Sequence, residues 1–398
     1  MNRVSENGEL LRYFKRGARY NRSDVPVGAR LRLYLVNIIV KLQNLVLALF
    51  NWLLYEKNRS PRSILIFRTG SLGDSLCAVP AIRCIAAQYP EATIDILTNA
   101  GRKNLAGMAH LLDKNLYREV IDYFGMPKKE LFGFLRKRNY DLVIQLPQAD
   151  ASFFSLLRNL VVFRAIATSG WGWRKNHLKL FAKTQAKYLL FNNEIKRLLE
   201  LVQQYGVRME EPRTFLQPGT ADQLRAEEVL KGLNLSAEKG IIAVVPGAKR
   251  PQNRWPLSYF QQVIAHFASR YSVVIIGGPE DAEWTQPLVT SDSVKNACGL
   301  LTPLQSAALL QKCLLSISND TGPMHLSYAV GTPTLALFSS RDLPGKWFPV
   351  KGNHAVLRAT DIPCQACFSE TCGNNICMQA ILPSTVIGLA EKLIGQSN

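Results

Sequence analysis

The sequence lacks both of the glycine-rich signatures that most often mark a nucleotide site. The segment "FRTGSLGDSLCAVPAI", residues 67–82, has two glycines three positions apart, so it matches neither the G-x-G-x-x-G fingerprint nor the G-K-[ST] of a P-loop. Acidic residues are also scarce: the sequence has 30 Asp and Glu and 48 Lys and Arg, which gives a net charge of +18. This balance favours polyanionic partners: nucleic acid, an anionic membrane or phosphorylated substrates.

Features typical of several protein classes are missing as well. The sequence has no arginine-rich tail, no zinc-finger spacing and no aromatic–basic RNA signature, so we expect no nucleic-acid partner. Residues 1–24 have neither an apolar core nor a cleavage site, so we expect no secretory signal. There is no repeat of solenoid length and no low-complexity tract. At 398 residues and 47% hydrophobic, the chain is long enough for two domains with large cores.

Eight cysteines divide into two groups. In a chain that looks cytosolic, thiols or metal ligands are expected more than disulfides. Cys77, Cys84, Cys298 and Cys313 lie in apolar runs and are expected to be small buried hydrophobes.

The other four cysteines lie in "CQACFSETCGNNIC" near the C-terminus. Cys364, Cys367, Cys372 and Cys377 form C-x2-C-x4-C-x4-C, which is dense enough to surround one tetrahedral ion. Structural zinc, free thiols and disulfides all remain open for this cluster.

Residues 31–57 are the most hydrophobic segment of the chain. Asn37, Lys41, Asn44, Ala48 and Asn51 recur at spacings of four and three, which draws one narrow stripe along a helix. The rest of the circumference is Leu, Ile, Val, Phe and Trp. Because a clean membrane span needs about 20 apolar residues without a charge, Lys41 argues against a span.

The flanks of this helix are basic. Arg30 and Arg32 lie at its start, and Lys57, Arg59 and Arg62 follow it. A wide apolar face with basic flanks is typical of a helix lying in an anionic leaflet. The alternative is a helix docked on its own protein.

From residue 63 onward, short apolar runs alternate with longer amphipathic segments. "SILIF", "TIDILT" and "DLVIQL" read as strands, with a helix over 75–88. After a Pro-, Gly- and charge-rich stretch at 206–240, which has room for a helix, the alternation restarts. Strands are then expected in "GIIAVVPG", "YSVVIIGG", "LLSISND" and "TPTLALFSS", with helices near 258–269, 303–312 and 322–330. This predicts an α/β fold with two parallel sheets covered by helices.

Ligands of open α/β sheets bind beyond the carboxyl ends of the strands. The candidate loops are therefore "TGSLGD" in the first domain, and "PGAKRPQNRWP", "GGPED" and "NDTGPMH" in the second. In the last loop, Asp320 and Thr321 suit a helix cap, Pro323 suits a first helical turn, and Gly322 leaves the backbone open. Exposed N–H groups at such a helix start bind phosphate readily.

Together these loops make the chain resemble glycosyltransferase family 9, which includes the ADP-heptose:lipopolysaccharide heptosyltransferases. The resemblance rests on "GSLGD" with "VPAI", "PG" with "RWP", "GGPED", and "NDTGPMHL" with "GTPTLALF", in that order, and covers roughly residues 63–385. It implies a GT-B fold of two Rossmann-like domains facing across a cleft. It also implies an inverting reaction that needs no metal and no cofactor. The implied domains are an extension over 1–60, an acceptor domain over 61–217 and a nucleotide-sugar domain over 218–398.

The resemblance also assigns roles to residues of the first domain. Asp74 matches the general base, which takes the proton from the acceptor hydroxyl, and a single displacement at an anomeric carbon needs such a carboxylate. Gly70, Ser71 and Gly73 are expected to let the backbone approach the sugars. The alternative for Asp74 is a plain helix cap.

The donor is expected on the second domain. Thr321 and Gly322 match the diphosphate-binding turn, Asp320 touches the donor sugar, and Glu280 binds the ribose; the remaining donor-binding candidates are Gly247, Lys249, Arg254 and His325. Backbone amides and cations would stabilise the leaving diphosphate. One position departs from the family pattern, because Asn253 stands where a lysine is expected, so the donor sugar and nucleotide are left open.

The predicted function is transfer of a sugar, heptose first, from a nucleotide sugar to a lipopolysaccharide-core or lipid-linked acceptor. The enzyme is expected to lie in the cytoplasm, peripherally on the inner membrane, with the nucleotide sugar, the lipid-anchored glycan and the anionic membrane surface as its partners. Three alternatives remain: another nucleotide sugar as donor, a degenerate glycan-binding or scaffold protein, and a sugar-nucleotide epimerase.

Overall fold

The computed structural model divides the chain into two compact units. It describes residues 27–99, 108, 111–112, 114–176, 191, 193–210, 213–235, 239–350, 352–360 and 362–396. Within this range, residues up to 176 and 194–210 form the first unit, and Phe191, Asn193 and residues from 213 onward form the second. The basic segment before residue 27 lies outside the described residues.

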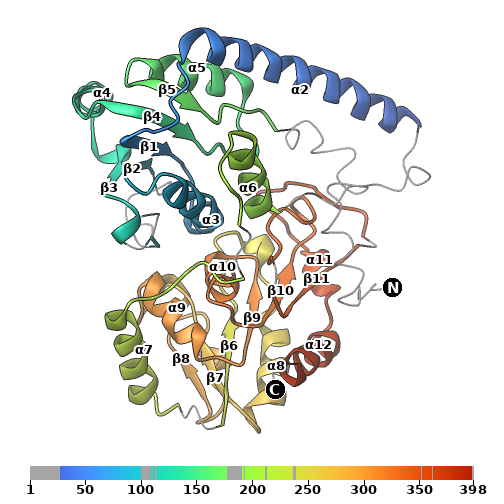
Figure 1. Ribbon diagram of the computed structural model, residues 1–398. Coiled ribbons are helices and arrows are strands. Elements are labelled where there is room, and N and C mark those ends of the chain that lie inside the picture. Colours follow the sequence, from blue (N-terminus) through green and yellow to red (C-terminus); the bar gives the residue numbers. More distant parts are fainter. Residues whose placement is uncertain are drawn as a thin grey trace. The chain divides into compact units, whose positions relative to one another are not determined.

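The first unit is built on a five-stranded parallel sheet of order β3-β2-β1-β4-β5 (Figure 1). β1 pairs on one side with β2 and on the other with β4, in parallel register. Its central residues are fully buried because both faces of the sheet are covered. The strands are β1 (Ser63–Phe67), β2 (Thr93–Thr98), β3 (Glu119–Asp122), β4 (Tyr140–Gln145) and β5 (Ala167–Trp171).

Helices connect these strands and cover the sheet. α3 begins directly after the loop that follows β1, and α6 packs against it. A hydrophobic core joins β1, β4 and α5 to the inner side of the N-terminal helix, through Leu47, Tyr55 and Trp173 among others. The helices are α2 (Val27–Leu54), α3 (Leu72–Gln88), α4 (Lys128–Lys137), α5 (Phe153–Arg164) and α6 (Glu194–Gln204).

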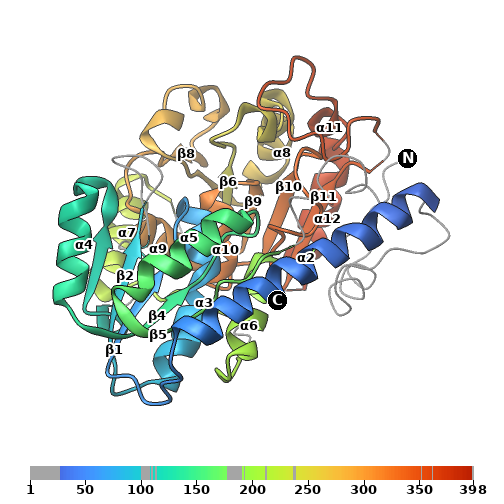
Figure 2. The same cartoon turned by 90° about the horizontal axis from the view of Figure 1, so that it is seen from above.

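The predicted hydrophobic helix is a single 28-residue element, α2, which runs beside α5 (Figures 1 and 2). It docks through the side that carries its asparagines. The side-chain amide of Asn44 donates to the carbonyl of Lys175 at 3.1 Å and accepts from the amide of Lys175 at 2.7 Å. Val40 and Leu47 are buried beside it.

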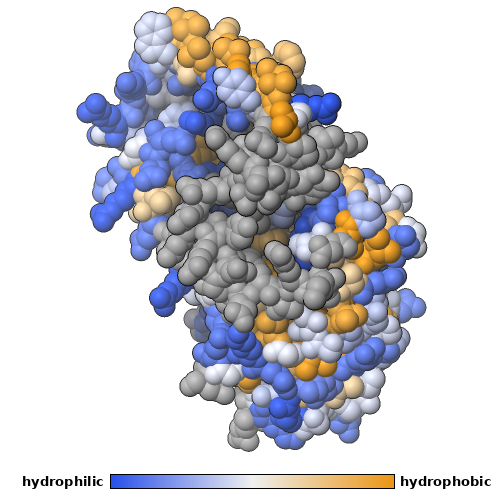
Figure 3. Space-filling view, turned by 90° about the vertical axis from the view of Figure 1, so that its right-hand side faces the viewer, coloured by the Kyte–Doolittle hydropathy of each residue, from blue (hydrophilic) through white to orange (hydrophobic). Residues whose placement is uncertain are grey.

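The apolar face of α2 points away from the unit and forms an apolar region at the top of Figure 3. We call these exposed side chains the apolar face of α2: Val27, Leu31, Tyr34, Leu35, Ile38, Ile39, Leu42, Leu45, Val46, Leu49, Phe50, Trp52 and Leu53. By length and composition, the part Tyr34–Leu54 is long and apolar enough to cross a membrane, and only 11% of its most apolar stretch is buried. The helix thus docks on its own unit and still exposes its apolar side.

The second unit holds a six-stranded parallel sheet of order β11-β10-β9-β6-β7-β8. Its core lies where the inner strands meet α8 and α12, around Trp255 and Phe260. The strands are β6 (Ile241–Val245), β7 (Ser272–Ile275), β8 (Val294–Asn296), β9 (Leu315–Asn319), β10 (Thr334–Phe338) and β11 (His354–Arg358). The helices are α7 (Thr220–Gly232), α8 (Leu257–Ala268), α9 (Pro303–Gln311), α10 (Gly322–Ala329), α11 (Ile376–Gln379) and α12 (Pro383–Gly395).

These elements confirm the predicted fold class, with two parallel sheets and a helical N-terminal extension. The stretch 206–240 carries the helix for which it has room, because α7 forms within it and packs on α9. The four cysteines predicted to be buried hydrophobes, Cys77, Cys84, Cys298 and Cys313, are indeed buried free thiols.

Candidate functional site

Each sheet has one point where the strand order changes direction. In the first sheet, β1 lies between β2 and β4, and in the second, β6 lies between β7 and β9. In open parallel sheets, ligands bind beyond the carboxyl ends of the strands at such a point. All predicted site residues follow β1, β6, β7 or β9. The topology of each unit therefore gathers its own predicted residues at one edge of its sheet.

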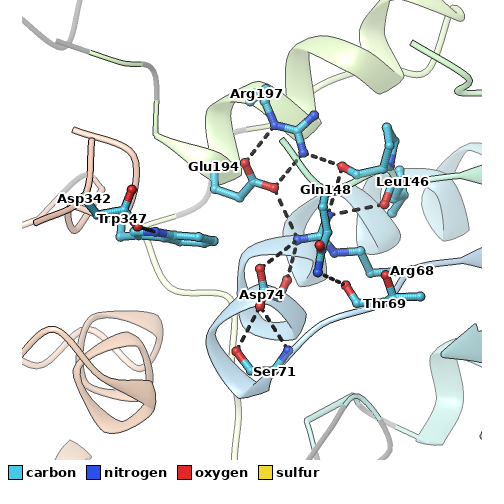
Figure 4. A network of polar contacts seen from close by, with 11 residues as sticks. Arg68, Thr69, Ser71, Asp74, Leu146, Gln148, Glu194, Arg197, Asp342 and Trp347 are labelled. Atoms are coloured by element: carbon cyan, nitrogen blue, oxygen red, sulfur yellow. Dashed lines mark hydrogen bonds and ion pairs between the residues drawn. The ribbon is translucent and has the colours of Figure 1, made fainter. Parts of the chain in front are cut away.

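Asp74 lies in the first turn of α3, and its carboxylate is held by the residue that caps this helix (Figure 4). Its Oδ2 accepts from the backbone N–H of Ser71 at 3.0 Å and from the Ser71 hydroxyl at 2.9 Å. Its Oδ1 accepts no hydrogen bond from the described residues and lies 3.9 Å from Nη2 of Arg68. With 20% of the side chain exposed, one oxygen orients the carboxylate and the other is available to a substrate proton.

Gly70 makes room for this carboxylate. Its φ is +138°, a conformation that favours glycine, and a Cβ at this position would lie 2.3 Å from Cβ of Asp74. Gly73 lies in the first turn of α3. The contact of these glycines with a sugar stays a prediction.

The sequence analysis missed Arg68, which is 1% exposed and joins the loops after β1 and β4 (Figure 4). Nη1 donates to the carbonyls of Leu146 at 3.3 Å and Pro147 at 3.1 Å. Nη2 donates to the backbone carbonyl of Asp74 at 3.0 Å and to Glu194 Oε1 at 3.3 Å. Arg68 therefore fixes the turn that carries Asp74.

Glu194 and Arg197, at the start of α6, complete this support. Arg197 donates hydrogen bonds to both carboxylate oxygens of Glu194, at 2.6 and 2.8 Å, and to the carbonyl of Pro147 at 2.6 Å. The Glu194 side chain is 1% exposed, so two guanidinium groups compensate its buried charge. The sequence holds no local signal for this pairing, because α6 lies far along the chain from β1.

On the second unit, Asp320 follows β9 and meets the loop that follows β6. The amide of Asn253 donates to Asp320 Oδ2 at 3.1 Å, while the Ser339 hydroxyl donates to the amide oxygen of Asn253 at 2.7 Å. Burial, followed by the nearby Asp342 carboxylate, raises the pKa of Asp320 to about 7, against the lowering effect of Arg250, Lys346 and Arg341. The protonated form of this carboxyl therefore persists to a higher pH than in an exposed aspartate.

Thr321 is the N-cap residue of α10, but its side chain makes no capping hydrogen bond. The N–H groups of the first turn are therefore left to other partners, as an anion site requires. Pro323 lies at the start of this helix, as predicted. His325, in contrast, is 4% exposed, and its Nδ1 is 2.7 Å from the hydroxyl of Tyr328. Burial lowers the pKa of His325 to about 4, so the ring is neutral at physiological pH.

Gly247 and Glu280 belong to neighbouring loops that share Asp281, another residue the sequence analysis missed. A Cβ at Gly247 would lie 2.3 Å from Oδ2 of Asp281, which accepts from the N–H of Gly278 at 3.1 Å. Asp281 is 7% exposed, and its second oxygen accepts from Trp284 Nε1 at 3.0 Å. Glu280 is exposed. The loop after β7 is thus held by Asp281, which leaves Glu280 at the surface.

Of the predicted cations, Arg254 is engaged locally: its guanidinium lies 4.9 Å from the Trp284 ring, and its Nε donates to the carbonyl of Ala248 at 3.0 Å. Lys249 is exposed. Arg250 lies 3.7 Å from Glu370. The donor-binding roles of these residues stay predictions.

Cys364, Cys367, Cys372 and Cys377 are free thiols. Partial burial and then the neighbouring Cys367 raise the pKa of Cys364. Among the residues that the structure describes, no three His, Cys, Asp or Glu side chains lie close enough together to hold a metal ion. The arrangement of the four thiols therefore does not support the zinc hypothesis, and the disulfide hypothesis finds no support either.

Comparisons with known proteins give one coherent result. A sequence model of glycosyltransferase family 9 (heptosyltransferase) matches residues 129–377. Lipopolysaccharide heptosyltransferase 2 of Salmonella typhimurium is 26% identical over 301 residues, which cover 69% of this chain and 82% of that protein.

Solved structures share the fold. A glycosyl transferase family 9 structure from Veillonella parvula aligns with a TM-score of 0.66 at 21% identity, covering 85% of this chain and 99% of that one. An Escherichia coli heptosyltransferase with ADP-2-deoxy-2-fluoro heptose aligns with a TM-score of 0.55 at 21% identity, covering 83% of this chain and 99% of that one.

Proposed function

The chain belongs to glycosyltransferase family 9 and has the GT-B fold, and from this premise we propose that it transfers a heptose from a nucleotide sugar to a lipopolysaccharide-core or lipid-linked acceptor. Membership confirms the resemblance to this family and makes the chain a glycosyltransferase; the matched residues 129–377 include "RWP", "GGPED" and "NDTGPMHL". The Salmonella relative, a lipopolysaccharide heptosyltransferase, supports the proposed donor sugar and acceptor.

The main support for this proposal is the hydrogen bonding of the two oxygens of the Asp74 carboxylate. Ser71 holds one oxygen, and the other accepts no hydrogen bond from the described residues. A general base must be oriented and must keep a lone pair free for the proton that it takes. We propose that Asp74 Oδ1 accepts the proton of the acceptor hydroxyl as that oxygen attacks the anomeric carbon. The configuration at this carbon is then inverted.

The leaving nucleoside diphosphate needs stabilisation as the bond to the sugar breaks. We propose that the uncapped start of α10 binds the diphosphate through its N–H groups. Arg250, Lys346 and Arg341 act electrostatically on Asp320, so positive charge is present beside this turn. Fixed amides and cations offset the developing charge without a metal ion in the proposed reaction. Glu280 and Asp320 are proposed to contact the ribose and the donor sugar.

We further propose that the enzyme lies peripherally on the inner membrane, through the apolar face of α2. A docked helix of a water-soluble protein turns its apolar side inward. α2 instead docks through Asn44 and exposes Leu, Ile, Phe and Trp side chains. Burial of this face in a leaflet would remove apolar surface from water at about 25 cal/mol per Å², and an anionic leaflet would attract its basic flanks.

The identity of residue 253 favours one alternative, in which the donor is a different nucleotide sugar. Asn253 stands where the family pattern has a lysine, and its amide contacts Asp320, the residue proposed to touch the donor sugar. The neutral amide changes both the charge and the reach of this position.

One experiment tests the reaction and the donor together. Purified full-length protein is incubated with ADP-heptose and with a panel of other nucleotide sugars, each with and without a heptose-deficient lipopolysaccharide acceptor. We expect nucleoside diphosphate release that requires the acceptor and a matching mass increase of the glycan. Release of free sugar without an acceptor would indicate an epimerase instead. Thermal stabilisation by a nucleotide sugar without any turnover would indicate a non-catalytic binding protein.

A further inference from the structure

The first unit contains a cavity of about 880 Å³ beneath α2. Its walls come from α2, from the segment that follows it, from β5 with the residues after it, and from the C-terminal ends of α3 and α6. Asp74 lies at the other end of α3, a helix about 25 Å long at 1.5 Å per residue. The cavity is therefore separate from the Asp74 turn. Its volume lies within the range of about 300–1,000 Å³ that is typical of small-molecule sites.

Aromatic rings form two of the walls. Trp171 and Tyr205 stack with centroids 4.7 Å apart and planes 15° apart, and Tyr55 and Trp173 lie 4.8 Å apart. A Cβ at Gly170 would lie 2.4 Å from the Trp173 ring, so a glycine at this place makes room for the indole. The rings offer flat apolar surfaces to a bound molecule.

Two polar atoms among the lining residues lack partners. Trp173 is 4% exposed, and its Nε1 has no hydrogen-bond acceptor among the described residues. The amide oxygen of Asn51 is also buried and has no donor there. Two turns earlier on α2, Asn44 is bonded to the backbone of Lys175 in both directions. Because buried polar groups are almost always paired, a molecule that offers an acceptor oxygen and a hydroxyl donor would satisfy these two atoms.

The lining residues are predominantly positive. Lys57, Arg59 and Arg174 line the cavity and are exposed, and Glu56 is the single carboxylate among the described lining residues. Guanidinium groups match the geometry of phosphate oxygens. The ligand is thus expected to carry a negative charge, for which a phosphodiester is well suited.

The cavity is continuous with the apolar face of α2 through Trp52. This residue lines the cavity, and 72% of it is exposed as part of that face. A molecule whose polar end lies in the cavity therefore has apolar protein surface next to it, where acyl chains find contact. A phospholipid combines a phosphate, oxygen acceptors and acyl chains in one molecule.

We propose that this cavity binds the headgroup of one anionic glycerophospholipid that carries a hydroxyl group, such as phosphatidylglycerol. Arg59 and Arg174 hold the phosphate, a headgroup hydroxyl donates to Asn51, and a lipid oxygen accepts from Trp173. The acyl chains lie along the apolar face of α2. The inference rests on the proposed placement of α2 in a leaflet and is independent of the sugar-transfer reaction.

The test is native mass spectrometry of the full-length protein in mild detergent with added phosphatidylglycerol, phosphatidylethanolamine or glycerol 3-phosphate. We expect one phosphatidylglycerol per protein, bound at least fivefold more than phosphatidylethanolamine, and no retained glycerol 3-phosphate. Arg59→Gln combined with Arg174→Gln should reduce the lipid-bound fraction at least fivefold. The control Lys128→Gln with Lys129→Gln removes two exposed cations from α4 and should change it less than twofold.

A second variant separates binding from folding. Asn51→Leu removes an amide oxygen that has no partner among the described residues, so the melting temperature without lipid should not fall. Stabilisation by phosphatidylglycerol should be lost. Equal binding of both phospholipids, or unchanged binding by the Arg59/Arg174 variant, would overturn the proposal. Equal retention of glycerol 3-phosphate would also overturn it, because the site would then take a soluble phosphate.

Failure here is distinguishable from failure of the proposed function. Flotation of the protein with liposomes tests the placement of α2, and acceptor-dependent release of nucleoside diphosphate tests the transfer reaction. Either result can stand while the lipid site is disproved.

Discussion

The amide of Asn253 donates a 3.1 Å hydrogen bond to the carboxyl group of Asp320. Burial raises the pKa of Asp320 to about 7, and an amide brings no positive charge to lower it. An ammonium group at this position would favour the ionised form. Asn253 therefore adds no positive charge to that of Arg250, Lys346 and Arg341, which lower the pKa of Asp320.

This relationship predicts how stability depends on pH. Because the pKa of Asp320 in the folded state lies above its unfolded value of about 3.9, the folded state binds more protons between pH 4 and 7. The contribution of Asp320 to stability is then complete below pH 4 and is lost as pH rises through 7. Asn253→Lys should lower this pKa and flatten the dependence. Thermal unfolding from pH 5 to 8 measures it, with Asp320→Asn as reference. An identical pH profile for wild type and Asp320→Asn would show that Asp320 does not titrate in this range.

Gly322 tests the proposed diphosphate site at the start of α10. Gly322→Val adds a branched side chain where the anion must approach the helix N–H groups, so affinity for nucleoside diphosphate should fall at least tenfold. Calorimetry with ADP measures this. Gly388→Val, at an exposed site of α12 with open space around it, is the matched control and should leave affinity unchanged. Unaltered affinity in a folded Gly322→Val variant would place the nucleotide elsewhere.

Arg68 tests the support beneath Asp74. Arg68→Gln removes one of the two guanidinium groups around the buried Glu194, so unfolding should become easier by about 3–5 kcal/mol. Turnover should fall as well, because the Asp74 turn loses its anchor. Urea denaturation gives the first quantity and initial rates the second. A stability change below 1 kcal/mol would show that Arg197 alone compensates Glu194.

The sequence predicts the elements whose signals are local in the chain, and it does not predict those that depend on contacts between distant residues. The buried strands β1, β2 and β6 were read correctly because continuous apolar runs bounded by turn residues are local signals. β5 was missed, because "ATSGW" is not a continuous apolar run: its Gly170 makes room for the Trp173 ring, and its small and polar residues give no strand signal.

At the candidate site, too, residues with a local signal were predicted and residues with long-range partners were not. Asp74 and Gly70 belong to one short turn, so a motif finds both. Glu194, Asp281 and Arg68 act through partners that only the folded chain brings near, and no spacing rule connects them. The sequence also could not predict which side of α2 docks on the unit, because a polar stripe can face either water or protein.

The apolar face of α2 gives a prediction on localisation. Leu45→Ser, Leu49→Ser and Leu53→Ser together remove exposed apolar side chains without touching the core, so the protein should float less with anionic liposomes. Deleting residues 1–60 is a poorer test than these substitutions, because Leu47 and Tyr55 belong to the core of the unit. Ala48→Ser is a control of the same helix. If wild-type protein remains in the soluble fraction during flotation with anionic liposomes at low salt, membrane binding is disproved.

Asp74→Asn is the most direct test of the proposed general base of the sugar transfer. The amide keeps the size of the side chain but cannot take a proton at neutral pH. With ADP-heptose and a lipopolysaccharide acceptor, turnover should fall by about 10²–10⁴, while affinity for ADP stays within twofold. A folded Asp74→Asn variant that keeps most of its turnover would show that Asp74 is not the general base.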